Sequence, residues 1–292
     1  MEKYRESKMI SLPSVVLSGL NMVSSELEKI FMGIDMPEAL KNAVRHYLTN
    51  RGKLVRPMLT LLTTYSLGGN IINAVRPAVA VELVHIASLL QDDIMDGHAV
   101  RRGSNTPFHM FGLENTMLAS DLIIAKSIEY AIMSDKKIVF ELINASIKLS
   151  IGQSYEMEYK YMKKTTLNDY IKTVSYKTSS LIEAALVVGG YAANADKDTI
   201  AKLRKLGNLM GIAYQVRDDI VDYLGLDANN PEDAGTGLNI VTILGRRTEE
   251  ALSILNKYLN ESIELAKDIF KTNNSEMLQL ISFLRLEDKV GT

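Results

Sequence analysis

The chain has 292 residues, of which 47% are hydrophobic and 23% charged, and its formal net charge is −2 at pH 7. This balance is typical of a globular protein, and the lack of a basic excess argues against a nucleic-acid partner. The chain contains no cysteine, which excludes disulfides, thiolate chemistry and cysteine-ligated zinc. The N-terminus lacks the apolar core of a signal peptide, and no segment reaches the ~20 uncharged apolar residues of a membrane span. We therefore expect a cytoplasmic protein with no integral membrane segment.

Most of the chain shows the periodicity of helices. Apolar residues recur at spacings of three and four, which predicts helices over residues 78–96, 113–133, 138–161, 167–192, 199–224 and 248–270. Breaks fall at residues 68–70, 103–107 and 227–237. No linker composition or βαβ rhythm interrupts this order. We expect one all-α domain over residues 1–292, a single large helical bundle of about ten or more helices around a central cavity.

Two bases flank the predicted start of a helix. Lys53 and Arg56 are three residues apart, and Pro57 suits the first turn of a helix. Anions bind at helix N-termini, so the pair is a candidate for phosphate binding. Taken alone, each base is more often an ordinary surface residue.

The helix predicted at 78–96 carries a polar stripe. His85 lies three residues before Ser88, seven before Asp92 and eleven before Asp96, which places all four on one face. The cluster DDIMD (92–96) directly follows the apolar run LVHIASLLQ. A lone histidine is more often a core residue, but here its place above the carboxylates makes it a candidate phosphate or substrate donor.

Further cations follow the first cluster. Arg101 and Arg102 come after one loop, and Lys177 with Thr178 precedes a largely apolar stretch. Any one of these could be a surface base, and only their fit to a common ligand makes them candidates.

The aspartate pattern returns in the helix predicted at 199–224. The cluster DDIVD (218–222) follows the apolar run GIAYQV, and Gln215 lies three residues before Asp218. Carboxylates four residues apart repel one another, and burying them is costly without a partner charge. Mg²⁺ prefers such oxygen ligands and bridges them to phosphates. One DDxxD segment could be a solvated helix end, but two that continue apolar helices predict a magnesium-bound diphosphate site.

In this order the segments resemble the trans-isoprenyl diphosphate synthases, also called polyprenyl synthetases. The resemblance runs from about Gly52 to Gly225 and rests on GKLVRP (52–57), ELVHIASLLQDDIMD (82–96), RRG (101–103), GQ (152–153), KTSSL (177–181) and YQVRDDIVD (214–222). It implies an all-helical homodimeric prenyltransferase. The implied reaction is the Mg²⁺-dependent head-to-tail condensation of isopentenyl diphosphate with an allylic prenyl diphosphate.

The resemblance also implies a role for each site residue. About three Mg²⁺ ions per site would bind Asp92, Asp96 and Asp218, with Asp93, Asp219 and Asp222 in support. The allylic diphosphate would be held by Arg101, Lys177, Thr178 and Gln215, and isopentenyl diphosphate by Lys53, Arg56, His85 and Arg102. The six aspartates and Lys177 are the implied catalytic residues. They would stabilise the departing diphosphate while the C–O bond ionises, and the isopentenyl double bond would attack the allylic cation.

The chain departs from the family pattern after the second cluster. Family members carry a lysine in a GK segment, then an acidic DL and a second lysine, whereas residues 226–245 contain no lysine or arginine. Three explanations are open: the backbone N–H groups of Gly235 and Gly237 replace a cation, the site is weakened, or the chain works with a partner subunit. Since every other signature is intact, we expect an active enzyme.

Two small residues bear on the length of the product. Ala87 and Ser88 lie five and four residues before Asp92, where bulky aromatics in the resembling family stop growth at farnesyl or geranylgeranyl length. We expect a longer product, geranylfarnesyl diphosphate or beyond, although an aromatic from another helix could close the tunnel. The alternative is a farnesyl or geranylgeranyl diphosphate synthase with the same chemistry.

Three other functions compete with this one. A class I terpene cyclase also ionises allylic diphosphates, but its second metal motif mixes Asn, Ser and Glu, and it needs no second diphosphate site. A weakly active regulatory subunit of a heteromeric synthase fits the loop without lysine but not the two intact clusters. A purely structural bundle would leave the polar residues inside apolar helices unexplained.

Overall fold

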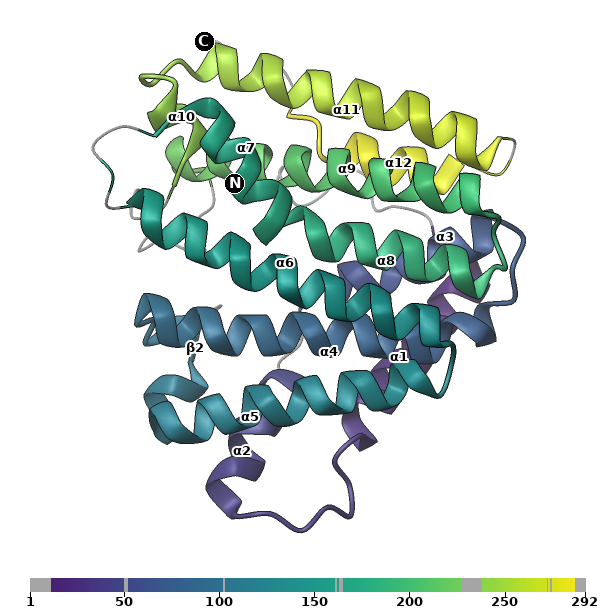
Figure 1. Ribbon diagram of the computed structural model, residues 1–292, viewed down its shortest axis with the longest axis vertical. Coiled ribbons are helices and arrows are strands. Elements are labelled where there is room, and N and C mark those ends of the chain that lie inside the picture. The colour runs from purple at the N-terminus through teal and green to yellow at the C-terminus, as the bar shows by residue number, and fades with distance from the viewer. Residues whose placement is uncertain are drawn as a thin grey trace.

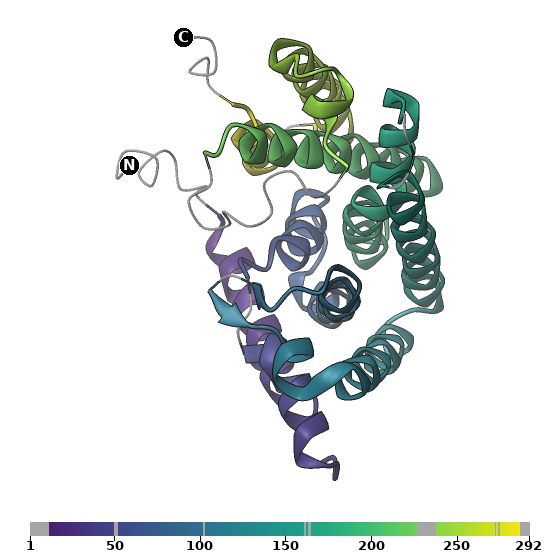
Figure 2. The same ribbon diagram turned by 90° about the vertical axis from the view of Figure 1, so that its left-hand side faces the viewer.

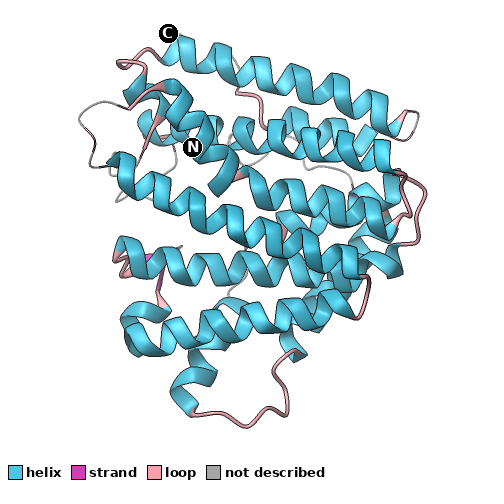
Figure 3. Cartoon of the chain, in the orientation of Figure 1, coloured by secondary structure: helices cyan, strands magenta, loops and turns pink. Residues whose placement is uncertain are grey.

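The structure is a computed structural model that describes residues 12–49, 52–101, 103–160, 162, 165–226, 238–271, 273 and 275–286. Within these residues the chain is almost entirely helical, as expected (Figures 1 and 3). Its helices are α1 (Ser14–Lys29), α2 (Glu38–Thr49), α3 (Val55–Ser66), α4 (Ile71–Asp96), α5 (Pro107–Ile132), α6 (Lys136–Lys160), α7 (Leu167–Lys177), α8 (Ser179–Ala192), α9 (Lys197–Tyr223), α10 (Ile240–Ile243), α11 (Thr248–Phe270) and α12 (Ser275–Phe283).

One short hairpin interrupts the helices at the break expected near residue 103. Strands β1 (Val100–Arg101) and β2 (Ser104–Asn105) pair antiparallel around Gly103, which has a φ of +76°. Glycine adopts this left-handed conformation without a steric penalty, so the chain can turn sharply after α4. The hairpin returns Arg101 to the end of α4.

Helix α4 is the centre of the bundle. It contacts α1, α3, α5, α6 and α8, and Figure 2 shows it enclosed by other helices. By length and composition α4 could cross a membrane, and it is the only such helix in the part of the chain that the structure describes. Most of its apolar stretch is buried inside the fold, as is usual for the core helix of a globular bundle.

Three predicted helices differ from the structure, and one of them, predicted from residue 113, begins at Pro107 as α5. The helix predicted to begin at residue 78 begins at Ile71, where Asn70 caps it by accepting a hydrogen bond from the Ile72 N–H, and it continues through Pro77. The single helix predicted over 167–192 is two helices, α7 and α8, which meet at Thr178. This junction turns the end of α7 towards the interior.

Close packing sets α9 against α8. A β-carbon at Gly207 would lie 2.4 Å from the Glu183 Cα, and one at Gly211 would lie 2.4 Å from the Ser179 Cα. Glycine is therefore required at both positions for the two backbones to approach. This contact brings Gln215, one turn beyond Gly211, next to the α7–α8 junction.

Candidate active site

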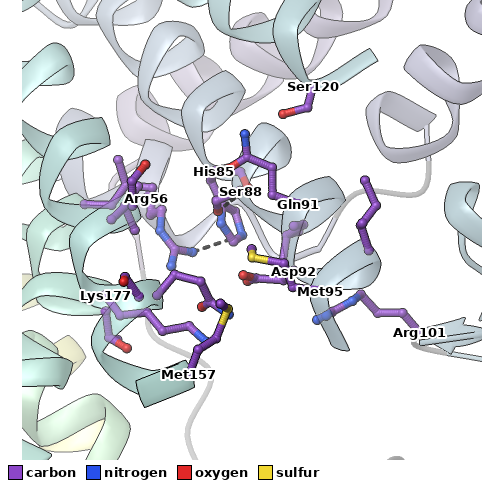
Figure 4. Close-up of a pocket in the computed structure, with 18 of the residues that line it drawn as sticks. Arg56, His85, Ser88, Gln91, Asp92, Met95, Arg101, Ser120, Met157 and Lys177 are labelled. Carbon is purple, nitrogen blue, oxygen red and sulfur yellow. Dashed lines mark hydrogen bonds between the residues drawn. The ribbon is translucent and has the colours of Figure 1, made fainter. Parts of the chain in front are cut away.

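A cavity of about 610 Å³ opens between α4, α5, α6, the α7–α8 junction and α9 (Figure 4). Charged and polar side chains from separate elements line it, and most of them are predicted site residues. Those on its wall are Arg56, His85, Ser88, Asp92, Arg101, Lys177, Thr178 and Gln215. The structure therefore brings together residues that are up to 159 positions apart in the sequence.

The other predicted site residues lie around this cavity. Ala87, Asp93 and Asp219 are buried behind its wall, and Asp218 is partly buried. Lys53, Asp96 and Asp222 are exposed. Arg102 and the glycines at 235 and 237 lie outside the described residues, so their expected roles remain predictions.

Asp92 and Lys177 form the charged end of the cavity. Lys177 pairs with Glu156 of α6, and burial alone would lower the pKa of its ammonium. The negative charges of Glu156 and Asp92 outweigh burial and raise that pKa, so Lys177 stays charged. Burial also raises the pKa of Asp92, against the opposing charges of Lys177 and Arg101. The Asp92 carboxylate is thus poorly solvated and would gain from a further cation.

The middle aspartate of the first cluster is fully paired. Asp93 accepts a hydrogen bond from the hydroxyl of Tyr47 on α2, and Arg101 Nε donates to its other oxygen at 2.6 Å. Asp93 is completely buried, so these two partners replace water. They hold Asp93 away from the cavity and fix the hairpin that carries Arg101.

The middle aspartate of the second cluster has neutral partners instead. Asp219 accepts hydrogen bonds from Gln215 Nε2 at 2.9 Å and from the Ile240 N–H at 2.8 Å. Thr178 in turn donates to Gln215 Oε1 at 2.9 Å. Burial raises the pKa of Asp219 to about 7 despite these bonds. Thr178, Gln215 and Asp219 are therefore one hydrogen-bonded chain from the cavity wall to α10.

Asp218 keeps more access to solvent. Its carboxylate lies 3.1 Å from Arg217 Nη1, and its side chain is 31% exposed. Burial raises its pKa to about 6, although Arg217 and the hydroxyl of Tyr214 act in the opposite direction. Like Asp92, it is a carboxylate whose charge is only partly compensated by the protein.

Arg56 and His85 form the second basic group. Arg56 Nη1 donates to His85 Nε2 at 3.0 Å, which makes His85 the acceptor on that nitrogen. Arg56 lies in the first turn of α3, and the preceding Leu54 has a left-handed φ of +50°. The N-terminal turn of α3 thus places Arg56 on the cavity wall, where it meets His85 of α4.

The aspartate carboxylates around the cavity do not surround a closed metal site in the described part of the chain. Among the described residues, no three or more histidine, aspartate or glutamate side chains form a closed metal-binding group. Mg²⁺ commonly keeps several waters and takes only one or two protein carboxylates, with substrate phosphates completing its shell. Oxygen-only ligands with burial-raised pKa values, such as Asp92 and Asp218, fit this ion.

Some contributors could not be found from sequence. Tyr47 reaches Asp93 across 46 residues, and Glu156 reaches Lys177 across 21. Neither belongs to a motif, and each is an ordinary polar residue within a helix. Asn239, which donates to the Asp219 carbonyl at 2.9 Å, is likewise recognisable only in three dimensions.

The chain is similar in sequence to known proteins. A family model described as polyprenyl synthetase matches residues 37–276. The chain is 31% identical over 249 residues to a short chain isoprenyl diphosphate synthase of Methanothermobacter thermautotrophicus, covering 78% of this chain and 77% of the relative. It is 36% identical over 206 residues to a geranylfarnesyl diphosphate synthase of Aeropyrum pernix, covering 67% and 64%.

A solved structure has the same fold. Geranylgeranyl pyrophosphate synthetase from Pyrococcus horikoshii superposes with a TM-score of 0.76 at 26% identity, covering 92% of this chain and 96% of that one. The chain therefore belongs to the polyprenyl synthetase family, the trans-isoprenyl diphosphate synthases, and is a prenyltransferase.

Proposed function

We propose that the protein is a trans-polyprenyl diphosphate synthase that condenses isopentenyl diphosphate head to tail with an allylic prenyl diphosphate in the presence of Mg²⁺. The observation that carries this proposal is the shared cavity wall of Asp92, Lys177 and the Arg56–His85 pair. Two anionic substrates need two separate basic groups, and the wall supplies both. Family membership supports the same pair of substrates.

Each group has a distinct task. Lys177, Arg101, Thr178 and Gln215 hold the allylic diphosphate, while Arg56, His85, Lys53 and Arg102 hold isopentenyl diphosphate. Asp92, Asp96 and Asp218, with the other three aspartates in support, would hold Mg²⁺, which when bound would neutralise charge on the leaving diphosphate. The charged Lys177 ammonium stabilises the same negative charge as the C–O bond breaks. Bringing both substrates onto one wall makes the attack on the cation effectively intramolecular.

The proposed product is geranylfarnesyl diphosphate or longer. Support comes from Ser88 on the cavity wall and from Ser120 of α5, which also lines it and donates to the Ala87 carbonyl at 3.2 Å. Both side chains are small, so a growing tail can pass between α4 and α5. The similarity to a geranylfarnesyl diphosphate synthase is compatible with this length.

We further propose a homodimer that covers the outer faces of α5 and α6. Phe140, Ile143, Ile147 and Ile151 form an exposed stripe at helical spacing, and Phe140 is 65% exposed. Met117 of α5 and Met157 of α6 are exposed too and also line the cavity. A second copy seated there would bury the stripe and close the cavity. Ile147→Asp should convert the dimer to a monomer in sedimentation experiments. A monomeric wild-type protein would contradict the proposed homodimer.

The test of function is product analysis by mass spectrometry. Purified protein receives farnesyl diphosphate, isopentenyl diphosphate and Mg²⁺, with a chelator control and with Asp92→Asn as the matched inactive variant. We expect metal-dependent products beyond geranylgeranyl length and a loss of about a hundredfold or more in the variant. A geranylgeranyl product would refute only the length. No elongation by the isolated chain would favour the second candidate, a regulatory subunit. The absence of lysine and arginine from residues 226–245 supports that candidate.

A further inference from the structure

Gln153 on α6 has a buried side chain with an unsatisfied carbonyl. The residue is 7% exposed and lies on the wall of the cavity. In the described part of the chain, its Oε1 atom is buried and has no hydrogen-bond partner. Leaving a buried polar atom unpaired costs free energy, and folded proteins contain few such atoms. A group that enters the cavity with a substrate is the natural partner for this oxygen.

Gln153 lies one helical turn deeper than the charged end of the cavity. Glu156, three residues further along α6, pairs with Lys177, and Lys177 faces Asp92 across that end. Three residues correspond to about 4.5 Å along the helix. Helices α4 and α6 both end on the same side of the bundle (Figure 1). With the diphosphate held at Asp92 and Lys177, Gln153 is beside the first carbons of the prenyl chain.

The substrates offer this oxygen no ordinary donor. A prenyl chain carries only C–H groups, and an ionised diphosphate accepts hydrogen bonds. Positive charge arises during the reaction, when the C–O bond breaks and the charge spreads over C1 and C3 of the allylic group. The negative end of a preorganised amide dipole stabilises such a charge in a site that excludes water. We infer that Gln153 is a further catalytic residue, whose side-chain carbonyl stabilises the allylic cation. This inference rests on the function proposed above.

The step assisted by Gln153 balances without any change in Gln153 itself. The C1–O bond of the allylic diphosphate breaks, and its electron pair leaves with the diphosphate. The double bond of isopentenyl diphosphate then supplies the electrons of the new bond to C1. The isopentenyl unit loses a proton to the released diphosphate. Gln153 contributes a fixed dipole that is in place before the reaction, because burial on α6 holds its side chain.

The experiment compares three variants with the wild type. Gln153→Met keeps the length of the side chain and removes the carbonyl, and Gln153→Asn keeps the carbonyl but draws it back by one methylene. Gln91→Met makes the same chemical change at an exposed amide on the cavity rim. For each protein, we would measure kcat and both KM values for condensation, the hydrolysis of farnesyl diphosphate alone, and Tm.

For Gln153→Met we expect kcat to fall about a hundredfold while both KM values stay within about twofold. Hydrolysis of farnesyl diphosphate alone should fall by the same factor, because ionisation precedes coupling. Tm should stay the same or rise, since an apolar group replaces an unpaired buried amide. Gln153→Asn should lie between Gln153→Met and the wild type, and Gln91→Met should match the wild type.

Other outcomes would overturn the inference. A lower Tm with unchanged kcat would make Gln153 structural, and an altered product length with unchanged kcat would make it part of the tunnel wall. Wild-type protein without any turnover would refute the proposed function itself, so the two failures are distinct.

Discussion

Gly152 of α6 packs directly on the backbone of Lys177 at the end of α7. A β-carbon at Gly152 would lie 2.3 Å from the Lys177 nitrogen and 2.7 Å from its Cα, well inside van der Waals contact. No side chain separates the two helices at this point. The position of the Lys177 ammonium beside Asp92 therefore depends on the absence of a side chain at residue 152.

Gly152→Ala should reduce both stability and activity. The methyl group must push α6 away from rigid backbone, and overpacking of this kind costs about 1–3 kcal/mol. The same shift should displace Lys177 and lower kcat. Denaturant unfolding and steady-state kinetics measure the two effects. Ser154→Ala, an exposed position two residues on, is the control and should leave the free energy of unfolding unchanged. A Gly152→Ala variant as stable as the wild type would contradict the close contact.

The metal-free protein should lose stability as the pH rises from about 4 to about 7. Burial raises the pKa of Asp219 to about 7 and that of Asp218 to about 6, from 3.8. Between these values the folded state binds more protons than the unfolded state, so stability falls with rising pH. Mg²⁺ stabilises the ionised carboxylates and should raise Tm more at pH 8 than at pH 5. Thermal unfolding with and without Mg²⁺ tests this.

Asp219→Asn is the matched variant for this pH dependence. The amide cannot ionise, so the variant should lose less stability than the wild type over the same pH range. An equal loss in both proteins would mean that other groups cause it.

Ser88→Phe and Ala87→Phe should have different effects. Ser88 lines the cavity, so a phenyl ring there should shorten the product while Tm changes little. Ala87 is fully buried, and its carbonyl accepts a hydrogen bond from Ser120. A ring at position 87 must displace α5, which costs about 1–3 kcal/mol. Mass spectrometry of the products and Tm values separate the two. Unchanged product length in Ser88→Phe would exclude this position as a floor.

Arg204→Met should destabilise the bundle far from the site. Arg204 of α9 lies 2.6 Å from both Glu141 and Glu183, whose side chains are 7% and 5% exposed. Lys148 still contacts Glu183 at 3.1 Å, and the Arg204 side chain is 40% exposed, so we expect a loss of about 1–3 kcal/mol. Lys202→Ala removes an exposed pair with Asp268 and should cost less than about 1 kcal/mol. Chemical denaturation measures the free energy of unfolding of both variants. An equal loss in Arg204→Met and Lys202→Ala would contradict the expected effect of the buried glutamates.

Sequence patterns predicted those helices whose bounds depend on residues close together in the chain. The helix expected at 248–270 is α11, which has the predicted bounds. The prediction succeeded because the apolar face of this helix is continuous from its first turn to its last. The break at Thr178 was not predicted, because the apolar periodicity runs through it and no glycine or proline marks it. The helix predicted from residue 78 begins at Ile71, because Asn70 supplies the cap and Pro77 lies within the helix.

The same distinction applies to the site. Repetition and register identified Asp92, His85 and Gln215, which all reach the cavity wall. Tyr47 lies in no motif, and its hydrogen bond to Asp93 arises only when α2 packs beside α4 and the hairpin. Sequence thus predicted the residues on the cavity wall better than those that hold them in place.

The ion pair between Lys177 and Glu156 means that the ammonium already has a counter-ion when the cavity holds no substrate. Binding of a diphosphate at Lys177, as proposed above, would then be an exchange of one anion for another rather than capture by an isolated cation. An anion with a single charge gains little over the Glu156 carboxylate, whereas a diphosphate brings several charges to the same place. Under the proposed function, Glu156 would therefore give the enzyme selectivity against chloride, carboxylates and other weakly charged solutes, although it belongs to no motif.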